Sequence, residues 1–397
     1  MVKKTLLCIL ICISVCIGGT GMSFAKKIVF DCDGSTVLSI FKDNTYYFIT
    51  TDIHSIESYV ANTDKNLSLQ DFKKIPFWGL SVGVYGNDII SGGIIFDDDD
   101  KEYKTHMGIF RQTGNRVDFV EIYKKENGRI PTVSKAFDTG IIICYKKEFE
   151  SVQRVALYKP YENKLIESKD VIASEWWIRE RRGVIPLPSG DFFLVGNVIG
   201  AKQPAFFRFD GDCVLQDTKT LDEILPGTPL VQGLAGRMLT GDSVLFWGEV
   251  EFFPNVESTR WWFAVYDLQQ KRITKTAVVT PGLGIMPYSI YDIAVLGDGR
   301  LCLCTSSVLF MLNADFALEG YWTADQKEPA GFEAVLTTAD GDLLVLGSTL
   351  FQRGGKASVW LVSPQDFKQD FKSYSPSSAE RESGVIEDLR DYVRLGD

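Results

Sequence analysis

The sequence predicts an all-β protein built from about seven copies of a unit of four antiparallel strands. Three observations support this prediction. Apolar residues alternate in short runs with a period of two, almost no stretch has the spacing of an amphipathic helix, and tight-turn residues return at a regular interval. Together these patterns indicate short strands joined by hairpins.

The interval between these turns is about 50 residues, and six such intervals separate the first turn from the last. Gly, Asp and Asn dominate the turns because these residues tolerate the positive φ that a two-residue hairpin requires. The turns lie at Asp43-Asn44, Gly86-Asn87, Asp138–Gly140, Ser189-Gly190, Thr240–Asp242, Gly297–Gly299 and Ala339–Gly341.

Hydrophobicity falls from the second strand to the fourth within each unit. The strand after each turn is the most apolar, as in Asp191–Val195 and Asp342–Gly347, so it must be covered on both faces. The third strand, such as Trp261–Tyr266, is followed by a more polar fourth strand, such as Lys271–Val278. We expect this gradient in a radial unit whose outermost strand faces water.

Four strands per unit and this period are typical of β-propeller blades. The units resemble those of the propeller superfamily that includes Trp-Asp-repeat, Asn-His-Leu-repeat and exported bacterial propellers. The resemblance covers residues 27–373 and implies a seven-bladed β-propeller of four-stranded antiparallel blades, with a domain over residues 26–373. It rests on pattern, because the signature residues of the Trp-Asp, kelch and sialidase repeats are absent, and no subfamily is assigned. Six or eight blades, or a pair of β-sandwiches, are the alternatives.

A propeller must close its ring without leaving a sheet edge open. The alternating segment Lys27–Cys32 precedes the first unit, and we predict that it pairs with Ser358–Val362 in the last blade. Residues 374–397 differ in character, with a Ser- and Pro-rich linker before a segment of helical spacing, Val385–Val393. This tail is expected to be a short helix on the ring or a disordered end.

The first 25 residues have the features of a signal peptide. Lys3 and Lys4 precede the apolar stretch Leu6–Ile17, which is shorter than the roughly 20 residues that span a bilayer. We predict cleavage after Ala25 and an exported mature protein, periplasmic or extracellular, with no transmembrane segment. A lipid anchor on Cys16 is the alternative.

The charge of the chain makes nucleic acid an unexpected partner. The net charge of −10 becomes −12 once Lys3 and Lys4 are removed with the signal peptide. An acidic surface is repelled by phosphate backbones and by anionic lipids. The expected partners are therefore a protein or a small molecule.

Five of the eight cysteines follow the predicted cleavage site, and their odd number and wide spacing do not suggest a disulfide framework. Cys302 and Cys304 alternate along an apolar strand, so we predict that both are core residues on the same face. At most one or two disulfides could form, and their connectivity is left open.

Three local motifs suggest a catalytic or metal site, but each is better explained as an ordinary part of the fold. Asp31 and Asp33 resemble the first motif of haloacid-dehalogenase-type phosphatases, but those enzymes need a parallel sheet with crossover helices. The carboxylates of Asp97–Asp100 could attract Ca²⁺, but consecutive residues in a loop point in different directions, so a solvated loop explains them better. His54 and His106 have no sequence neighbour with which to form a zinc site or a catalytic triad. No cofactor or metal site is predicted, with Ca²⁺ as the alternative.

The segment Ser174–Arg182, between the third and fourth units, has the composition of an interaction anchor, because Trp and Arg side chains dominate binding hot spots. In a propeller this loop opens beside the central channel. The alternative is that the tryptophans fill the gap between blades and the arginines are solvated. The candidate ligand- or partner-binding residues are Trp176, Trp177, Arg179, Glu180, Arg181 and, from another loop of the same face, Tyr288.

These features favour a binding module that recognises a protein or small ligand through its loop face. A second hypothesis is a propeller hydrolase or lyase with a carboxylate site at the channel mouth, which could depend on Ca²⁺ and use Glu175, Glu180 or Asp292. A third is a structural subunit of a surface assembly. The fold alone does not decide among them.

Overall fold

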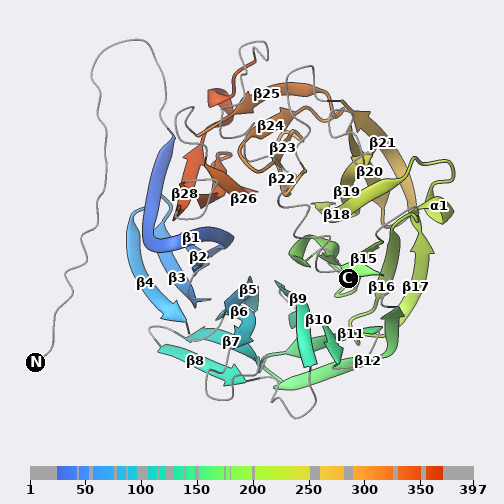
Figure 1. Cartoon of the computed structure of the whole chain (residues 1–397), viewed down its shortest axis with the longest axis horizontal. Helices are drawn as coiled ribbons and strands as arrows, with labels where there is room; N and C mark the ends of the chain where they lie inside the picture. The colour runs from blue at the N-terminus through green and yellow to red at the C-terminus, as the bar shows by residue number, and fades with distance from the viewer. Residues whose placement is uncertain are drawn as a thin grey trace, which may run out of the picture.

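The computed structural model describes residues 25–369, except 43, 53–56, 76–77, 86–87, 96–105, 114–115, 122–128, 138–139, 148–151, 174–175, 179, 199–201, 251–259, 281–288, 325–329 and 350–354. Almost all the regular structure in these ranges is β-strand. The strands form antiparallel sheets arranged as blades around a central axis (Figure 1). The protein is a multi-blade β-propeller of four-stranded blades, as the sequence predicts, and a pair of sandwiches is excluded.

The described strands form six hydrogen-bonded sheets, five of which follow one another along the chain. The first contains β5 (Trp78–Tyr85), β6 (Asp88–Ile95), β7 (His106–Thr113) and β8 (Arg116–Glu121). The next contains β9 (Arg129–Phe137), β10 (Gly140–Lys147), β11 (Val152–Lys159) and β12 (Lys164–Ala173). The third contains β13 (Trp177–Ile178), β14 (Val184–Pro186), β15 (Phe192–Asn197), β16 (Ala205–Phe209) and β17 (Leu215–Thr220).

Two further four-stranded sheets complete this series. One contains β18 (Val231–Thr240), β19 (Ser243–Val250), β20 (Arg260–Asp267) and β21 (Arg272–Val279). The other contains β22 (Asp292–Val295), β23 (Leu301–Cys304), β24 (Leu309–Leu312) and β25 (Leu318–Trp322). The helical segments within the described ranges are α1 (Leu221–Ile224), η1 (Glu180–Gly183) and η3 (Pro364–Asp366).

The sixth sheet closes the ring and has seven strands. It contains β26 (Gly331–Thr337), β27 (Leu343–Ser348), β28 (Lys356–Val362), β1 (Lys26–Lys42), β2 (Thr45–Asp52), β3 (Glu57–Asp64) and β4 (Leu69–Ile75). The start of β1 pairs with β28, from Lys26 opposite Leu361 to Val29 opposite Ser358, and its later part pairs with β2. One strand therefore ends the last blade and begins the first, which confirms the predicted pairing of Lys27–Cys32.

The apolar gradient predicted from the sequence is present. All six residues of β15 and of β27 are buried, whereas β17 is mostly exposed and β21 alternates between exposed and half-buried residues. Trp261 and Trp262, at the start of β20, are both buried in the core.

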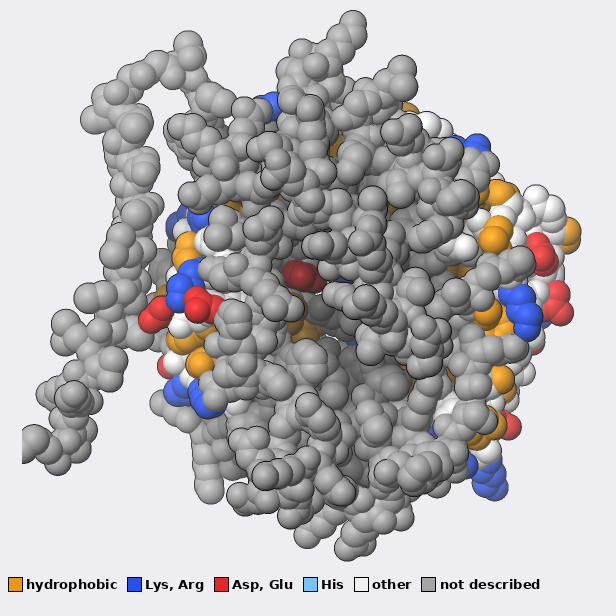
Figure 2. Space-filling model, viewed as in Figure 1, with side chains coloured by type: hydrophobic (Ala, Val, Ile, Leu, Met, Phe, Trp, Pro, Cys, Tyr) orange, Lys and Arg blue, Asp and Glu red, His pale blue; other side chains and the backbone are white. Residues whose placement is uncertain are grey.

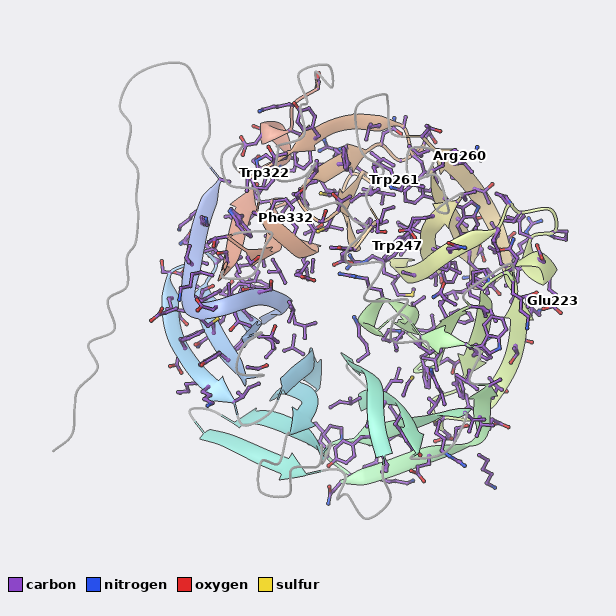
Figure 3. All side chains as sticks on the ribbon, in the orientation of Figure 1. Glu223, Trp247, Arg260, Trp261, Trp322 and Phe332 are labelled. Carbon is purple, nitrogen blue, oxygen red and sulfur yellow. The ribbon has the colours of Figure 1, made fainter. Side chains whose placement is uncertain are left out.

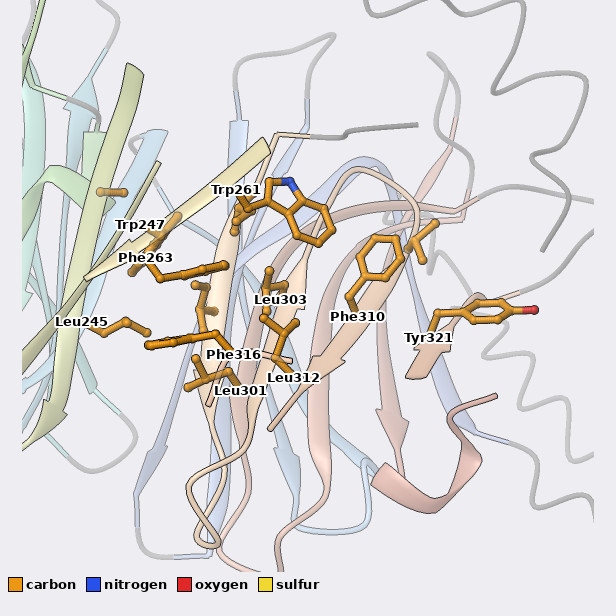
Figure 4. Packing of buried hydrophobic residues seen from close by; sticks show 14 residues of the cluster. Leu245, Trp247, Trp261, Phe263, Leu301, Leu303, Phe310, Leu312, Phe316 and Tyr321 are labelled. Atoms are coloured by element: carbon orange, nitrogen blue, oxygen red, sulfur yellow. The ribbon is translucent and has the colours of Figure 1, made fainter. Parts of the chain in front are cut away.

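The hydrophobic core lies between neighbouring blades. The cluster between the β18–β21 and β22–β25 blades contains Trp261 5.1 Å from Phe310, and Phe263 stacked on Phe316 at 5.2 Å, measured between ring centroids (Figure 4). At the next boundary Trp322 stacks on Phe332 at 5.8 Å (Figure 3). Each blade thus depends on its neighbours to cover its faces.

The hairpin turns are of two kinds, and the prediction that all have two residues is wrong for three of them. Lys42 pairs with Thr45, and Thr240 with Ser243, which leaves two residues in each loop. The turn before β15 is longer, because Gly190 N donates to Leu187 O at 3.0 Å and Leu187 N to Asp191 O at 2.8 Å. A type I turn followed by a glycine at positive φ forms such a three-residue loop. Gly190, Gly299 and Gly341 occupy this position with φ of 85°, 85° and 86°.

A second repeated turn joins the third and fourth strands of a blade, and the sequence pattern did not predict it. The Oδ1 atoms of Asp64, Asp210 and Asn313 each accept two backbone N–H groups of the following turn. Three residues later come Leu67, Cys213 and Phe316, with φ of 59°, 62° and 65°. These three side chains are buried in the clusters shared with the preceding blade. They therefore help to seal the blade boundaries.

Polar side chains also connect adjacent blades. Asn197 of β15 accepts a hydrogen bond from Leu234 N at 2.6 Å and donates one to Leu234 O at 3.0 Å in β18. Glu249 of β19 accepts from Ile290 N at 3.1 Å, and Gln153 of β11 donates to Trp176 O at 3.0 Å. Each of these side chains is at most 4% exposed, so its bonds are shielded from water.

We predict that Asn197→Ala lowers the free energy of unfolding by about 2–4 kcal/mol, because two buried backbone groups of Leu234 lose their partner. Urea unfolding monitored by tryptophan fluorescence measures the loss. Gln216→Ala is the control, since its exposed amide bond to Asp210 should be worth about 0.5 kcal/mol or less. Equal effects of the two variants would contradict the prediction.

Candidate functional site

The inner edge of the β13–β17 blade is interrupted by a short insertion. β13 pairs with Gly196 and Asn197 of β15, and β14 pairs with Phe192–Leu194 of the same strand. Between them η1 leaves the sheet and contacts β9 and β18, the inner strands of the two neighbouring blades. In Figure 1 this is the green turn inside the ring. Of the candidate segment, the part in η1 thus lies toward the ring centre.

Arg182, in η1, connects its blade with two others. Its Nη2 donates a hydrogen bond to Glu333 O in β26, and its guanidinium carbon lies 5.6 Å from the centre of the Tyr291 ring, next to β22. No carboxylate among the described residues lies within ion-pair distance of this guanidinium, which is only half-buried. Arg182 therefore holds a positive charge near the ring centre with donors left over.

Asp292, the first residue of β22, lies in the same region. Its Oδ1 accepts from Ile293 N at 2.9 Å and its Oδ2 from Val335 N at 3.2 Å, which fixes the carboxylate. Arg237 Nη1 lies 3.8 Å from Asp292 Oδ1, too far for a hydrogen bond, and is buried without another partner. Figure 2 shows acidic side chains at the centre of the ring. Arg182, Arg237, Tyr291, Asp292 and Glu333 are called the central cluster below.

The thiols next to the central cluster are not nucleophiles. Burial raises the pKa of Cys302 and Cys304 well above the usual range, and the charge of Asp292 raises it further. Burial likewise raises the pKa of Cys144, and raises that of Cys213 to about 12. Because the thiolate is the reactive form, these side chains act as small core residues. The sequence prediction for Cys302 and Cys304 is confirmed in that both are buried.

The predicted binding residues are only partly described. Trp176 is half-buried, packs edge-on against Phe207 at 6.0 Å, and lies so close to Gly196 that a Cβ there would be 3.2 Å from its own Cβ. Trp176 thus contributes to the boundary between blades. Arg179 and Tyr288, and the side chains of Trp177, Glu180 and Arg181, lie outside the described residues, as does Glu175. For all six candidates a binding role stays a prediction.

Arg237, Tyr291 and Glu333 were not among the residues predicted from the sequence, and Arg182 did not stand out within its segment. These residues lie in or beside the innermost strands of four different blades and are far apart along the chain. Their common signal is a charged or phenolic residue in a first strand that is otherwise apolar.

The remaining motifs are placed as follows. Asp31 and Asp33 lie in β1, where Lys356 Nζ contacts their carboxylates at 3.4 and 2.7 Å, so they form surface ion pairs at the ring closure. His106 lies in β7, and its side chain, His54 and Asp97–Asp100 are outside the described residues. In the described ranges no three His, Cys, Asp or Glu side chains are grouped as a metal site, and no helix is long and apolar enough to cross a membrane.

Comparison with known proteins identifies the fold alone. No protein-family model matches the sequence, and no curated protein matches it. Among solved structures, YCF48 bound to the D1 peptide has a TM-score of 0.53 at 12% identity, over 88% of this chain and 99% of that one. Hydrazine synthase from Kuenenia stuttgartiensis has a TM-score of 0.57 at 10% identity, over 80% of this chain and 94% of that one. A catalytically inactive histidine variant of virginiamycin B lyase from Staphylococcus aureus, with quinupristin, has a TM-score of 0.57 at 10% identity, over 85% of this chain and 99% of that one.

Burial of all five thiols, and the raised pKa values of Cys144, Cys213, Cys302 and Cys304, predict that Cys32, Cys144, Cys213, Cys302 and Cys304 resist alkylation while the protein is folded. All five are buried, and none is in a disulfide. With iodoacetamide at pH 8.5, mass spectrometry should find no labelled cysteine among the five in the native protein and all five labelled in 6 M guanidinium chloride. Rapid labelling of Cys302 or Cys304 in the native protein would contradict the prediction that these thiols are unreactive.

Proposed function

We propose that the protein is an exported propeller that binds a protein or peptide partner at the ring centre, with Arg182 contacting an acidic group of that partner. The observation that carries the proposal is the position of Arg182. Its guanidinium is held by Glu333 O and the Tyr291 ring without a carboxylate partner among the described residues. An arginine whose donors have no carboxylate partner can bind a carboxylate ligand, which accepts two parallel hydrogen bonds from the guanidinium.

The residues around Arg182 support a binding role. Trp177, Arg179, Glu180 and Arg181 belong to the same insertion, and Tyr288 lies three residues before Tyr291. Tryptophan, tyrosine and arginine are the residues most often found at binding hot spots. The structurally similar YCF48 is bound to a peptide, which is an analogy of fold and supports the proposal only in that sense.

Two further features belong to this proposal. Export rests on the signal-peptide pattern of residues 1–25. A count of seven blades is supported by the division of the closing sheet at β1, whose two ends belong to β26–β28 and to β2–β4, in addition to the five other sheets.

A second candidate function is a hydrolase or lyase that uses Asp292, either alone or with Ca²⁺. The observation that favours it is the fixed carboxylate of Asp292 3.8 Å from Arg237 Nη1, which has no hydrogen-bond partner, since an oriented acid and a cation can transfer a proton and stabilise negative charge. The similar fold of a lyase is compatible with this candidate.

A thermal-shift screen of acidic peptides tests the binding proposal, because a ligand that binds only the folded state stabilises it by about 2.7 kcal/mol at 100 times its Kd. We expect peptides with a free C-terminal carboxylate or an acidic side chain to raise Tm, and their amidated, neutral counterparts to have little effect. Arg182→Ala should abolish the shift and Arg182→Lys should reduce it. Arg272→Ala, on the outer strand β21, should behave like the unchanged protein. A shift that survives Arg182→Ala would contradict the proposal.

Asp292→Asn separates the two candidate functions. The amide retains an acceptor for Val335 N and removes the charge. If the protein is a binder, peptide affinity should change by about threefold or less, since Asp292 is not the predicted contact. If the protein is an enzyme that depends on Asp292, turnover of its substrate should fall by about 100-fold or more, as expected for loss of an acid–base group. Substrate binding should be retained.

A further inference from the structure

A cleft lies between the β13–β17 and β18–β21 blades, away from the central cluster. Its volume is about 450 Å³, within the range of about 300–1,000 Å³ that is typical of small-molecule sites. Its lining combines aromatic and charged side chains: Asp191, Phe193, Phe206, Arg208, Asp210, Gln216, Asp217, Lys219, Ile224, Phe246, Tyr266 and Lys271. We call it the aromatic cleft.

The floor of the aromatic cleft is rigid and apolar. Phe246 contacts Phe206 edge-to-face at 4.7 Å, and Phe193 contacts Tyr266 in the same geometry at 5.9 Å, between ring centroids. Phe193, Phe206 and Phe246 are buried in the cluster between the two blades. This floor is already formed without a ligand, so a flat apolar molecule could pack on it at little cost in ordering.

The acidic groups of the cleft already have partners. Asp191 Oδ2 lies 2.6 Å from Arg208 Nη2, and Asp217 Oδ2 lies 3.3 Å from Lys219 Nζ. The carboxylate of Asp210 accepts the N–H groups of its own turn through Oδ1 and the Gln216 amide through Oδ2. These carboxylates are therefore occupied within the protein.

The side-chain groups of the cleft that lack a partner are hydrogen-bond donors. Arg208 uses Nη2 for Asp191, and its Nε is buried with no acceptor. No acceptor among the described residues bonds the Tyr266 hydroxyl or the Lys271 ammonium. Burial raises the pKa of Tyr266, so its hydroxyl stays protonated and able to donate at neutral pH. A ligand for this set must supply acceptor atoms.

Lys271 is held at the rim of the cleft by the turn between β20 and β21. Asp267 pairs with Arg272, so this turn has four residues, and Lys271 is the last of them with φ of 53°. Asn163 has the same place in the four-residue turn between β11 and β12, with φ of 48°, and is also exposed. Lys271 is exposed in the same way and lines the cleft.

The neighbouring cleft, between the β18–β21 and β22–β25 blades, provides a comparison. Its volume is about 670 Å³, and Lys275 lies on its wall. Lys275 Nζ already bonds Ala314 O at 2.7 Å and Asp315 Oδ1 at 2.8 Å, and lies 5.0 Å from the Phe316 ring centre. Its charge is satisfied internally, so the two clefts differ in the availability of a cation.

We propose that the aromatic cleft is a second binding site, which takes a small organic acid with a flat apolar body. The carboxylate lies against Lys271, Arg208 and Tyr266, and the apolar body packs toward Phe193, Phe206 and Phe246. The site is independent of the central cluster and of the partner proposed there.

Isothermal titration calorimetry with phenylacetate tests this assignment, and phenylacetamide is the neutral counterpart of the same shape. We expect phenylacetate to bind at least about tenfold more tightly than phenylacetamide, because hydrogen bonds to charged groups are stronger than neutral ones. Higher salt should weaken phenylacetate binding and leave phenylacetamide unaffected.

Lys271→Gly is the decisive variant. Glycine adopts the left-handed conformation freely, so the fold should keep or gain stability while phenylacetate affinity falls about tenfold. Tyr266→Phe should weaken binding by a smaller factor. Lys275→Ala, in the neighbouring cleft, and Arg182→Ala, at the ring centre, should leave it unchanged.

Three outcomes would overturn the inference. Phenylacetate could fail to bind at millimolar concentration, or phenylacetamide could bind as well. Lys271→Gly could bind phenylacetate like the unchanged protein. Loss of binding in Arg182→Ala with retention in Lys271→Gly would place the acid at the ring centre, which would support the proposed function and exclude the aromatic cleft.

Discussion

The structure depends on covering sheets that are apolar on both faces. The second strands β15, β23 and β27 bury all their side chains, so each of these blades alone would expose two hydrophobic surfaces to water. In a closed ring every blade lies between two others, so both of its hydrophobic faces are covered. Its closure needs one strand shared by the two ends of the chain, and β1 provides it by pairing with β28 and with β2 (Figure 1).

The boundaries between blades therefore carry both the stability and the chemistry of this protein. Where side chains complete the boundary, as with Asn197 against Leu234 or Phe316 on Phe263, the groups are satisfied and serve the fold. Where a cation is left without a carboxylate, the same architecture offers a binding position. Arg182 does so at the ring centre, on an insertion in a first strand, and Lys271 does so at a cleft, at the end of an exposed turn.

Much of the blade architecture could be predicted from one sequence, because strand burial is expressed in local composition. The second strands, the polar fourth strands and the pairing of Lys27–Cys32 all agree with the structure. The three-residue hairpins at Gly190, Gly299 and Gly341 were misjudged, since glycine at positive φ suits more than one turn type. The turn repeat of Leu67, Cys213 and Phe316 was missed because apolar residues are not expected in left-handed conformations.

The sequence by itself determined the fold class, the repeat and the strand that closes the ring, because these follow from periodicity and turn chemistry within short segments. It also indicated segment 174–182 as a candidate site. Only the tertiary structure showed that Trp176 packs at a blade boundary, and that Arg182 meets Tyr291 and Glu333. Arg182 is more than a hundred positions from both Tyr291 and Glu333, and the three residues converge only when the ring forms. For the same reason the free donors of the aromatic cleft become visible only when two blades are packed together.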